Sequence, residues 1–362
     1  MSTAIRAEVP SEAARWQARV RVEVMREVGG FVAARCAEHV AVPDAGELAA
    51  VLTGFAAGGK YVRSAFFLAG WSCVAEPTPA AVRAAGSLEL LHCFALLQDD
   101  VMDGSALRRG RPAAHVVFAE WHRREGLSGC ADRFGESAAV LAGDLCLVWS
   151  EQMLRESGVD GAALGRAMRR YDRMRSDLAV GQFRDLVNDS RRLPALDDVR
   201  DVARAKSGDY TVRGPLELGA ELAGAAEGQL DALGRYGRVV GEAFQLRDDL
   251  LGLFGSTEVT GKPVGEDLRA RKATAVVVLA RERADPAARR ELARLDGLDR
   301  LTDDDVERYL RVLAATGARE WAERLIGQRL AEGIAALSRV PLPDPARDRL
   351  LHLAHSCGSR SH

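Results

Sequence analysis

Residues 79–103 read PAAVRAAGSLELLHCFALLQDDVMD, a long apolar run that ends in three aspartates. Thr78 provides a capping hydroxyl and Pro79 a favourable first position, so the sequence predicts a helix from there to about Asp103. Residues 227–254 have the same pattern, because a second apolar stretch ends in FQLRDDLLGLF, which contains two aspartates. The chain therefore predicts two apolar helices that each end in a cluster of acid.

The rest of the chain favours the same secondary structure. Apolar residues recur mostly at helical spacing among Ala, Leu, Arg and Glu, which are good helix formers. The runs RVRVEVM (19–25) and AVVVLA (275–280) look strand-like, but both lie within helix-compatible sequence. We predict an all-α fold in a single domain spanning 1–362, although two tightly packed halves remain open. Asp44, after Pro43, is expected to open another helix, and residues 355–362 to be frayed.

Composition restricts the partners. The formal net charge is −2 with mixed signs along the chain, so no broad cationic face is expected for nucleic acid. The N-terminus lacks a signal-peptide core, and no uninterrupted apolar run reaches the roughly 20 residues of a membrane helix. We expect no membrane span and a cytoplasmic location. The six cysteines form no CxxC pair and are expected to be reduced: Cys36, Cys73, Cys93, Cys130, Cys146 and Cys357.

The two acidic clusters suggest a metal. On a helix, Asp99 and Asp103 project from one face with Asp100 beside them, and like charges about 6 Å apart repel by a few kcal/mol. A single DDxxD is most often a solvated helix end. The second cluster, Asp248 and Asp249, makes two acidic helix ends that could face each other. Oxygen ligands without His or Cys suit Mg²⁺ bridged to a phosphate-bearing substrate.

Small basic groups accompany these clusters, at Lys60 and Arg63, at Arg108 and Arg109, at Lys206, and at Lys262 and Lys272. Each alone could be an ordinary solvated side chain, but together they could hold diphosphates.

His92 lies seven residues before Asp99 on the same helix face, so its side chain can reach a site there. It could equally be a satisfied core residue. Glu89-x-x-His92 is also half of a di-iron signature, but the second half is missing.

In this order, the motifs resemble those of the trans-isoprenyl diphosphate (polyprenyl) synthases from residue 58 to residue 272. The matching stretches are GGKYVRS (58–64), ELLHCFALLQDDVMDGSALRRGRPAAH (89–115), LAGDL (141–145), GQFRD (181–185), AKSGDY (205–210), FQLRDD (244–249) and TGKPVGEDL (260–268).

The resemblance implies roles by position. Asp99, Asp103 and Asp248 would be the magnesium ligands, and would act in catalysis with Lys206 and Ser207. Two sets of basic residues would hold the substrates: Lys60, Arg63, His92 and Arg109 the diphosphate of isopentenyl diphosphate, and Arg108, Lys206 and Lys262 the allylic diphosphate. Gln182, Asp185 and Gln245 would line the site, and Lys272 would belong to a basic closing segment. The sequence departs from the family pattern at Ser64 for Pro, Gln98 for His, Ser207 for Thr, and Gly252 for the last aspartate.

The implied reaction joins isopentenyl diphosphate to an allylic diphosphate, assisted by three Mg²⁺ ions, to give a short-chain all-trans prenyl diphosphate. Phe94, five residues before Asp99, with Ala95 and Leu91 beside it, would limit the product to C20. C15 farnesyl diphosphate is the next alternative. Family analogy implies a homodimer.

Two other functions are weighed. A terpene cyclase would not need the grip at Lys60, Arg63 and Arg109, and its NDxxSxxxE motif is not matched at Asn188-Asp189-Ser190. A non-catalytic regulatory subunit is disfavoured by the intact aspartates. The sequence leaves open the allylic primer and the pathway served.

Overall fold

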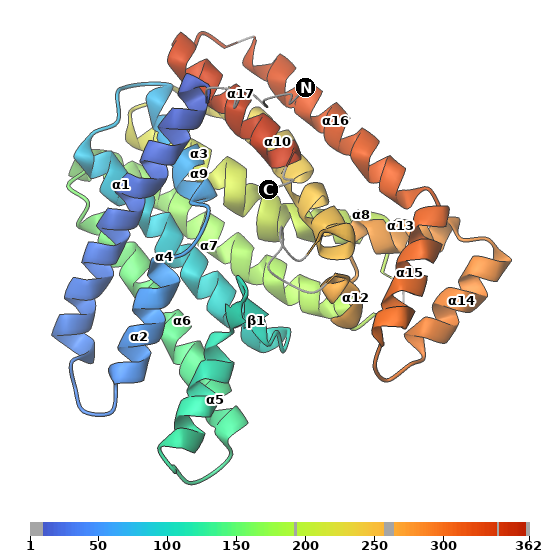
Figure 1. Ribbon diagram of the computed structural model, residues 1–362. Coiled ribbons are helices and arrows are strands. Elements are labelled where there is room, and N and C mark those ends of the chain that lie inside the picture. Colours follow the sequence, from blue (N-terminus) through green and yellow to red (C-terminus); the bar gives the residue numbers. More distant parts are fainter. Residues whose placement is uncertain (1–9, 192–193, 257–263, 339, 360–362) are drawn as a thin grey trace, which may run out of the picture.

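The computed structural model describes residues 10–191, 194–256, 264–338 and 340–359 (Figure 1). The all-α prediction is confirmed, because the described elements are helices apart from one hairpin of two short strands. Both strand-like runs are helical, within α1 (Glu12–Arg35) and α13 (Ala275–Arg283).

The remaining elements, in chain order, are η1 (Cys36–Val40), α2 (Gly46–Ala56), α3 (Val62–Ser72), α4 (Pro79–Met102), β1 (Leu107–Arg108), β2 (Arg111–Pro112), α5 (Ala114–Arg124), α6 (Ala131–Arg155), α7 (Gly161–Asp189), α8 (Leu196–Ala203), η2 (Arg204–Arg213), α9 (Gly214–Leu222), α10 (Glu227–Phe254), α12 (Glu266–Arg269), α14 (Pro286–Asp296), α15 (Asp303–Ala315), α16 (Ala318–Leu337) and α17 (Asp344–Gly358). The segments η1 and η2 are π-helical.

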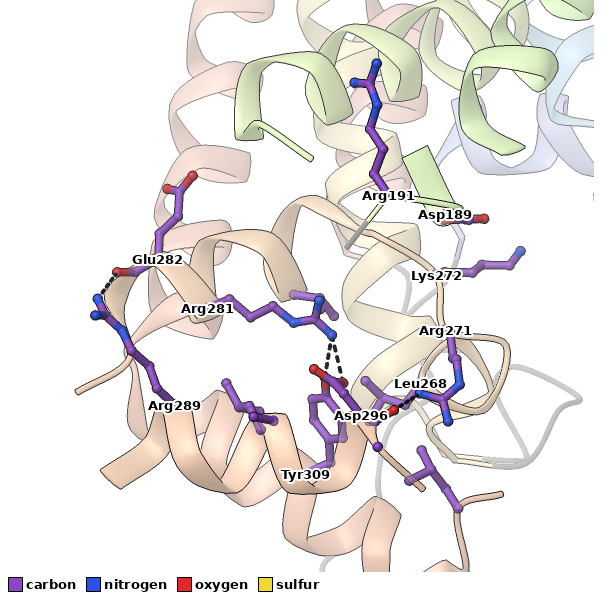
Figure 2. A pocket seen from close by; sticks show the side chains of 15 residues that line it. Asp189, Arg191, Leu268, Arg271, Lys272, Arg281, Glu282, Arg289, Asp296 and Tyr309 are labelled. Carbon is purple, nitrogen blue, oxygen red and sulfur yellow. Dashed lines mark hydrogen bonds and ion pairs between the residues drawn. The ribbon is translucent and has the colours of Figure 1, made fainter. Parts of the chain in front are cut away.

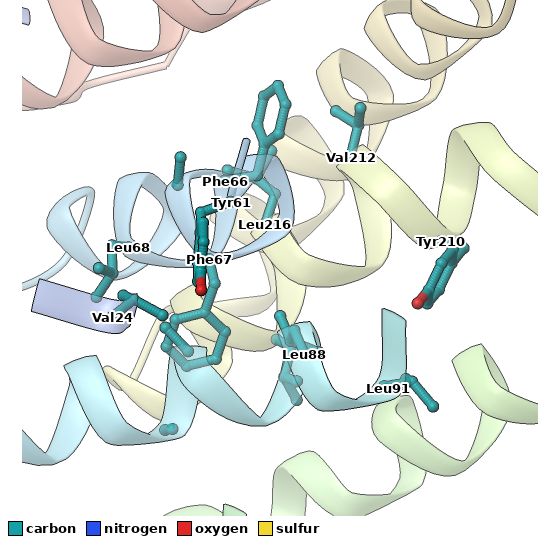
Figure 3. Packing of buried hydrophobic residues seen from close by; sticks show 14 of the residues in the cluster. Val24, Tyr61, Phe66, Phe67, Leu68, Leu88, Leu91, Tyr210, Val212 and Leu216 are labelled. Atoms are coloured by element: carbon teal, nitrogen blue, oxygen red, sulfur yellow. The ribbon is translucent and has the colours of Figure 1, made fainter. Parts of the chain in front are cut away.

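The two acid-tipped helices are central to the packing. Helix α4 contacts α1, α3 and α6, and α10 contacts η2, α9, α16 and α17. Side chains of α1, α3, α4 and α9 interleave in a core cluster, part of which is drawn in Figure 3. Fully burying a Leu or Phe side chain contributes about 1.5–3 kcal/mol. The cluster therefore holds α4, and with it the acidic C-terminal end of the helix, in a fixed position.

Helices α3 and α9 approach unusually closely. A Cβ placed on Gly70 would lie 2.1 Å from the Leu216 carbonyl oxygen, and one on Gly219 would lie 2.0 Å from that of Phe67. Only glycine permits such backbone contact. The pair of glycines therefore sets the position of η2, which leads directly into α9.

A second core cluster joins α10 to α12–α16. Helix α10 belongs to both clusters, since Val240 and Phe244 lie in the first, and Ala243 and Leu246 in the second. The single-domain prediction remains a prediction.

Helix boundaries test three sequence predictions. Thr78 caps α4 as expected, its hydroxyl accepting the Ala81 N–H at 3.2 Å. The prediction for Asp44 is wrong: α2 begins at Gly46, and Asp44 occupies the preceding turn at φ 70°. The predicted frayed tail is wrong for residues 355–358, because α17 continues to Gly358 and buries Cys357 against the core. Residues 360–362 lie outside the described part.

By length and composition alone, α4 could cross a membrane, and in the described residues it is the one helix of 18 or more residues that passes this test. However, 61% of its most apolar window is buried inside the protein, as in the core helix of a folded domain. The six cysteines, all within the described residues, are free thiols.

Candidate active site

The first acidic cluster closes α4. Carboxylates at a helix C-terminus repel each other and oppose the helix dipole, so they require cations. The hairpin β1–β2 supplies one: Arg108 Nε donates to Asp100 Oδ1 and Oδ2 at 2.9 and 3.1 Å, and Nη2 reaches Asp99 Oδ2 at 3.4 Å. Left-handed residues at the hairpin turn, Arg109 and Gly110, fold the strand back over the helix end.

A second cation comes from η2. Lys206 Nζ lies 3.2 Å from Asp99 Oδ1 and 2.6 Å from Asp185 Oδ2. Gln182 Nε2 donates to the same Asp99 oxygen at 3.4 Å. Gly181 lets α7 approach, since a Cβ there would lie 2.9 Å from the Lys206 backbone nitrogen. The sequence predicted Lys206 in the site but gave no sign of the π-helix that carries it, a feature frequent at functional sites.

Lys272 is the third cation, in the segment between α12 and α13. Its Nζ lies 2.6 Å from Asp103 Oδ2. Burial opposes the charge on Lys272, but the carboxylates of Asp99 and Asp103 outweigh burial and raise the pKa of its ammonium. Burial likewise opposes the charge on Asp99, yet Lys206 and Lys272 hold its pKa below the ordinary value.

The second acidic cluster divides into an exposed and a buried carboxylate. Asp248 is exposed and Asp249 is buried. Gln245 Nε2 donates to Asp249 Oδ1 at 2.7 Å. Burial, with smaller contributions from the Asp267 and Asp248 carboxylates, raises the pKa of Asp249 to about 7.

Asp267 of α12 takes the space that Gly252 leaves open. A Cβ on Gly252 would lie 1.9 Å from Asp267 Oδ2. This chain therefore brings a third carboxylate to the end of α10 from α12, at the place where the family resemblance led us to expect an aspartate of α10 itself. Asp267 was not among the site residues predicted from the sequence.

Lys272 interacts with carboxylates of both helix ends. Its ammonium contacts Asp103 and interacts electrostatically with Asp99 and with Asp267, and Asp267 in turn interacts with Asp249. Among the described residues, no three His, Cys, Asp or Glu side chains are close enough together to hold a metal ion. Cations separate the carboxylates instead.

A further basic group lies beside α3. Arg63 stacks over the Tyr210 ring at 4.3 Å and donates to Thr211 Oγ1 at 2.9 Å, and the His92 ring is 6.4 Å from that of Tyr210. Neither Tyr210 nor Thr211 was predicted as a site residue, although Tyr210 ends the motif AKSGDY that contains Lys206 and Thr211 follows it.

Arg109 lies over the glycines that precede the exposed Lys60. A Cβ on Gly58 would lie 2.5 Å from Arg109 Nη1, and Gly59 has φ 131°. Arg109 and Arg63 both lie close enough to Cys93 to affect its thiol. Burial raises the pKa of that thiol to about 12, and the charges of Arg109 and Arg63 both oppose the rise.

Ser64 and Glu89 explain one departure from the family pattern. Glu89 Oε1 accepts the Ser64 amide at 3.1 Å and the Ser64 hydroxyl at 2.7 Å. A proline at position 64 could donate neither bond. The buried Glu89 is therefore engaged by α3.

The predicted chain-length residues lie on the core side of α4. Leu91 is fully buried, while Phe94 and Ala95 are half-buried and pack against the first core cluster. Their role stays a prediction. Ser207 lies within η2 beside Lys206. Lys262 lies outside the described residues.

All four lysines of the chain are candidate site residues. Lys60, Lys206, Lys262 and Lys272 are the only lysines among 50 Lys and Arg residues. Arginine fills every other basic position. A compact ammonium, which can exchange partners easily, therefore occurs only where a diphosphate is expected.

Comparison with known proteins identifies the relatives of this chain. The polyprenyl synthetase family model matches residues 47–313. The (2E,6E)-farnesyl diphosphate synthase of Mycobacterium tuberculosis is 36% identical over 301 residues, covering 82% of this chain and 78% of that protein. The geranylgeranyl diphosphate synthase of the same organism is 36% identical over 290 residues, covering 80% and 76%. Identity alone thus does not separate the two product lengths.

A solved structure has the same fold. Geranylgeranyl pyrophosphate synthase from Corynebacterium glutamicum, complexed with isoprenyl diphosphate and magnesium, superposes with a TM-score of 0.90 at 34% identity. The match covers 97% of this chain and 100% of the other.

Proposed function

Because this chain belongs to the polyprenyl synthetase family and is a short-chain trans-prenyl diphosphate synthase, we propose that its product is geranylgeranyl diphosphate (C20). The observation that supports the prenyl-transfer chemistry is the set of carboxylates at the ends of α4 and α10, with three cations among them, and the one that supports the product length is the position of Phe94 on α4.

Magnesium fits this donor set. The ligands would be Asp99, Asp103 and Asp248, which offer only carboxylate oxygens, as a hard cation requires. The related structure from C. glutamicum contains magnesium. Bound magnesium would neutralise the negative charge that develops on a departing diphosphate.

The cations of the chain would bind the allylic diphosphate. Lys206, Arg108 and Lys272 now pair with carboxylates. Arg108 and Lys206 also contact Asp99, so magnesium at Asp99 and Asp103 would leave these ammonium and guanidinium groups available for the diphosphate oxygens. Their charge stabilises the leaving group as the allylic carbon–oxygen bond ionises.

Isopentenyl diphosphate would be held at the second basic group. Arg109 lies against the two glycines that precede Lys60, and Arg63 and His92 lie beside the Tyr210 ring. Held there, its double bond would attack the allylic cation, and transfer of a proton to the departing diphosphate would restore an alkene. Exclusion of water protects the cation.

Product length is proposed from α4. The growing chain would extend along the helix away from Asp99, and Phe94 would limit it about 7.5 Å below. The half-buried position of Phe94 against the core supports this placement.

A homodimer is proposed from α6. Leu141 and Val148 are seven residues apart on one helix face, and each is 62% exposed. A second copy of the chain would bury this apolar stripe.

The test is incubation with magnesium, isopentenyl diphosphate and each allylic primer in turn, with chromatography of the dephosphorylated products. We expect a C20 alcohol. A C15 product would contradict the proposed length and favour a farnesyl diphosphate synthase. Purified protein that consumes no isopentenyl diphosphate would instead indicate a regulatory subunit, and conversion of a single prenyl diphosphate to a hydrocarbon would indicate a cyclase.

A further inference from the structure

The position of Lys272 depends on a short connecting segment, residues 270–274, between α12 and α13. The Lys272 side chain is only 24% exposed, with its Nζ on Asp103. A lysine side chain is long and flexible, so the backbone must be held if the ammonium is to remain there.

One side of this segment faces a cavity, so side-chain packing does not hold it there. Arg271 and Lys272 line a partly open cavity of about 1080 Å³ whose other lining residues come from elements between α7 and α15, and Figure 2 shows these side chains. Since the cavity offers no close-packed wall, specific hydrogen bonds must fix the segment.

One anchor is Arg271. Its φ of 55° is left-handed, a conformation that is unfavourable for a non-glycine residue. The strain is offset by its guanidinium, which donates to the carbonyl oxygen of Asp296 at 2.8 Å and also to that of Leu298. Arg271 thus ties the segment to the end of α14.

The other anchor is Asp189, the last residue of α7. Its Oδ1 accepts the Ala273 N–H at 2.9 Å. A carboxylate there opposes the helix dipole, so its position on α7 is unfavourable unless this contact compensates. The same helix carries Gln182 and Asp185, which contact Asp99 and Lys206. Helix α7 therefore contacts Lys206 through Asp185 and the segment that carries Lys272 through Asp189.

We propose that Asp189 is a positioning residue for prenyl transfer: through the Ala273 amide it holds the connecting segment so that Lys272 reaches the acidic cluster. The proposal rests on the proposed function. Asp189 acts through Lys272 and touches neither substrate.

The kinetic test compares Asp189→Ala with Asp189→Asn, which keeps an oxygen acceptor for the Ala273 amide. We expect Asp189→Ala to lower kcat/KM for the allylic diphosphate by roughly ten- to a hundredfold, with the KM for isopentenyl diphosphate unchanged. Asp189→Asn should stay within about threefold of wild type. The matched control is Asp201→Ala, which removes an exposed carboxylate that pairs with Arg204.

A double-mutant cycle tests the route. If Asp189 acts through Lys272, Asp189→Ala should have almost no effect in a Lys272→Ala background. An undiminished effect there would overturn the proposal.

A readout without turnover separates this proposal from the proposed function. The rate of Lys272 acetylation by an amine-reactive acetylating reagent, followed by mass spectrometry, should rise in Asp189→Ala while that of Lys206 stays constant. Arg271→Gly relieves the backbone strain but removes the other anchor, so it should also raise the rate of Lys272 acetylation. This variant provides the readout if Asp189→Ala folds poorly. Unchanged Lys272 acetylation in both variants overturns the positioning role, whereas a wild type inactive with every primer overturns only the function.

Discussion

At the scale of single residues, charge balance decides most of the site. Asp99, Asp100 and Asp103 are stabilised by three cations that arrive from separate elements. The sequence could predict each carboxylate and each cation from its motif. It could not predict their pairing, because the partners are up to 169 residues apart, as with Asp103 and Lys272.

Removal of a predicted magnesium ligand should abolish turnover without unfolding the chain. Asp99→Ala and Asp248→Ala should each lower kcat by about 10²-fold or more, because diphosphate charge loses its stabilisation. Helical circular dichroism should be unchanged. Asp132→Ala, which removes a carboxylate 75% exposed on α6, is the control and should keep full activity. Near-normal turnover in either site variant would contradict the metal assignment.

Restoring the family aspartate at position 252 should impair this protein. A side chain on Gly252 would displace Asp267, whose Oδ2 lies 1.9 Å from the ideal Cβ position. Glycine-to-alanine changes within a helix ordinarily stabilise by about 0.5–1 kcal/mol. We expect Gly252→Ala and Gly252→Asp to lower Tm instead, and to raise the magnesium concentration needed for half-maximal activity.

Gly228→Ala is the matched control for that comparison. It lies on the same helix, and a Cβ there meets nothing within 4 Å. A higher Tm in Gly252→Ala, with unchanged magnesium dependence, would show that Asp267 has no fixed place beside α10.

At the scale of elements, the apolar pattern predicted α4 and α10 almost to the residue, since long buried helices have strong periodicity and clear ends. The predictions for the start of α2 and for fraying at the end of α17 were wrong. Asp44 has the residue type of a cap, but the chain turns there at φ 70° before α2 begins. Small residues near the C-terminus suggested fraying, while Cys357 packs against the core. A local turn decided the first, and packing against the core decided the second.

The prediction at this scale concerns α4 as the floor for the product. Phe94→Ala should shift the products beyond C20, because a shorter side chain would open space along the helix below Asp99. Val82→Ala, a half-buried residue at the other end of α4, should leave product length unchanged. The product lengths are measured by chromatography. Identical product distributions for Phe94→Ala and wild type would show that Phe94 does not limit the length of the product.

At the scale of the whole molecule, the distribution of basic residues points to the site. Only four of 50 Lys and Arg side chains are lysine, and all four are candidate site residues. The net charge, which counts Lys and Arg together, could not reveal that the four lysines all fall at candidate site positions. The consequence is chemical: a reagent specific for amines can modify only these four side chains and the α-amino group, because guanidinium groups do not react under the same conditions.

Two modifications of the same amines therefore make a matched comparison. Acetylation removes the positive charge of lysine, whereas reductive dimethylation keeps it. Acetylation should abolish turnover, beginning with the exposed Lys60 and more slowly at Lys206 and Lys272, which are 19% and 24% exposed and paired with carboxylates. Dimethylated protein should retain more activity at equal extent of modification, and magnesium with inorganic diphosphate should protect Lys206 and Lys272. Full turnover after complete acetylation of all four lysines would mean that their charge has no part in binding the diphosphates.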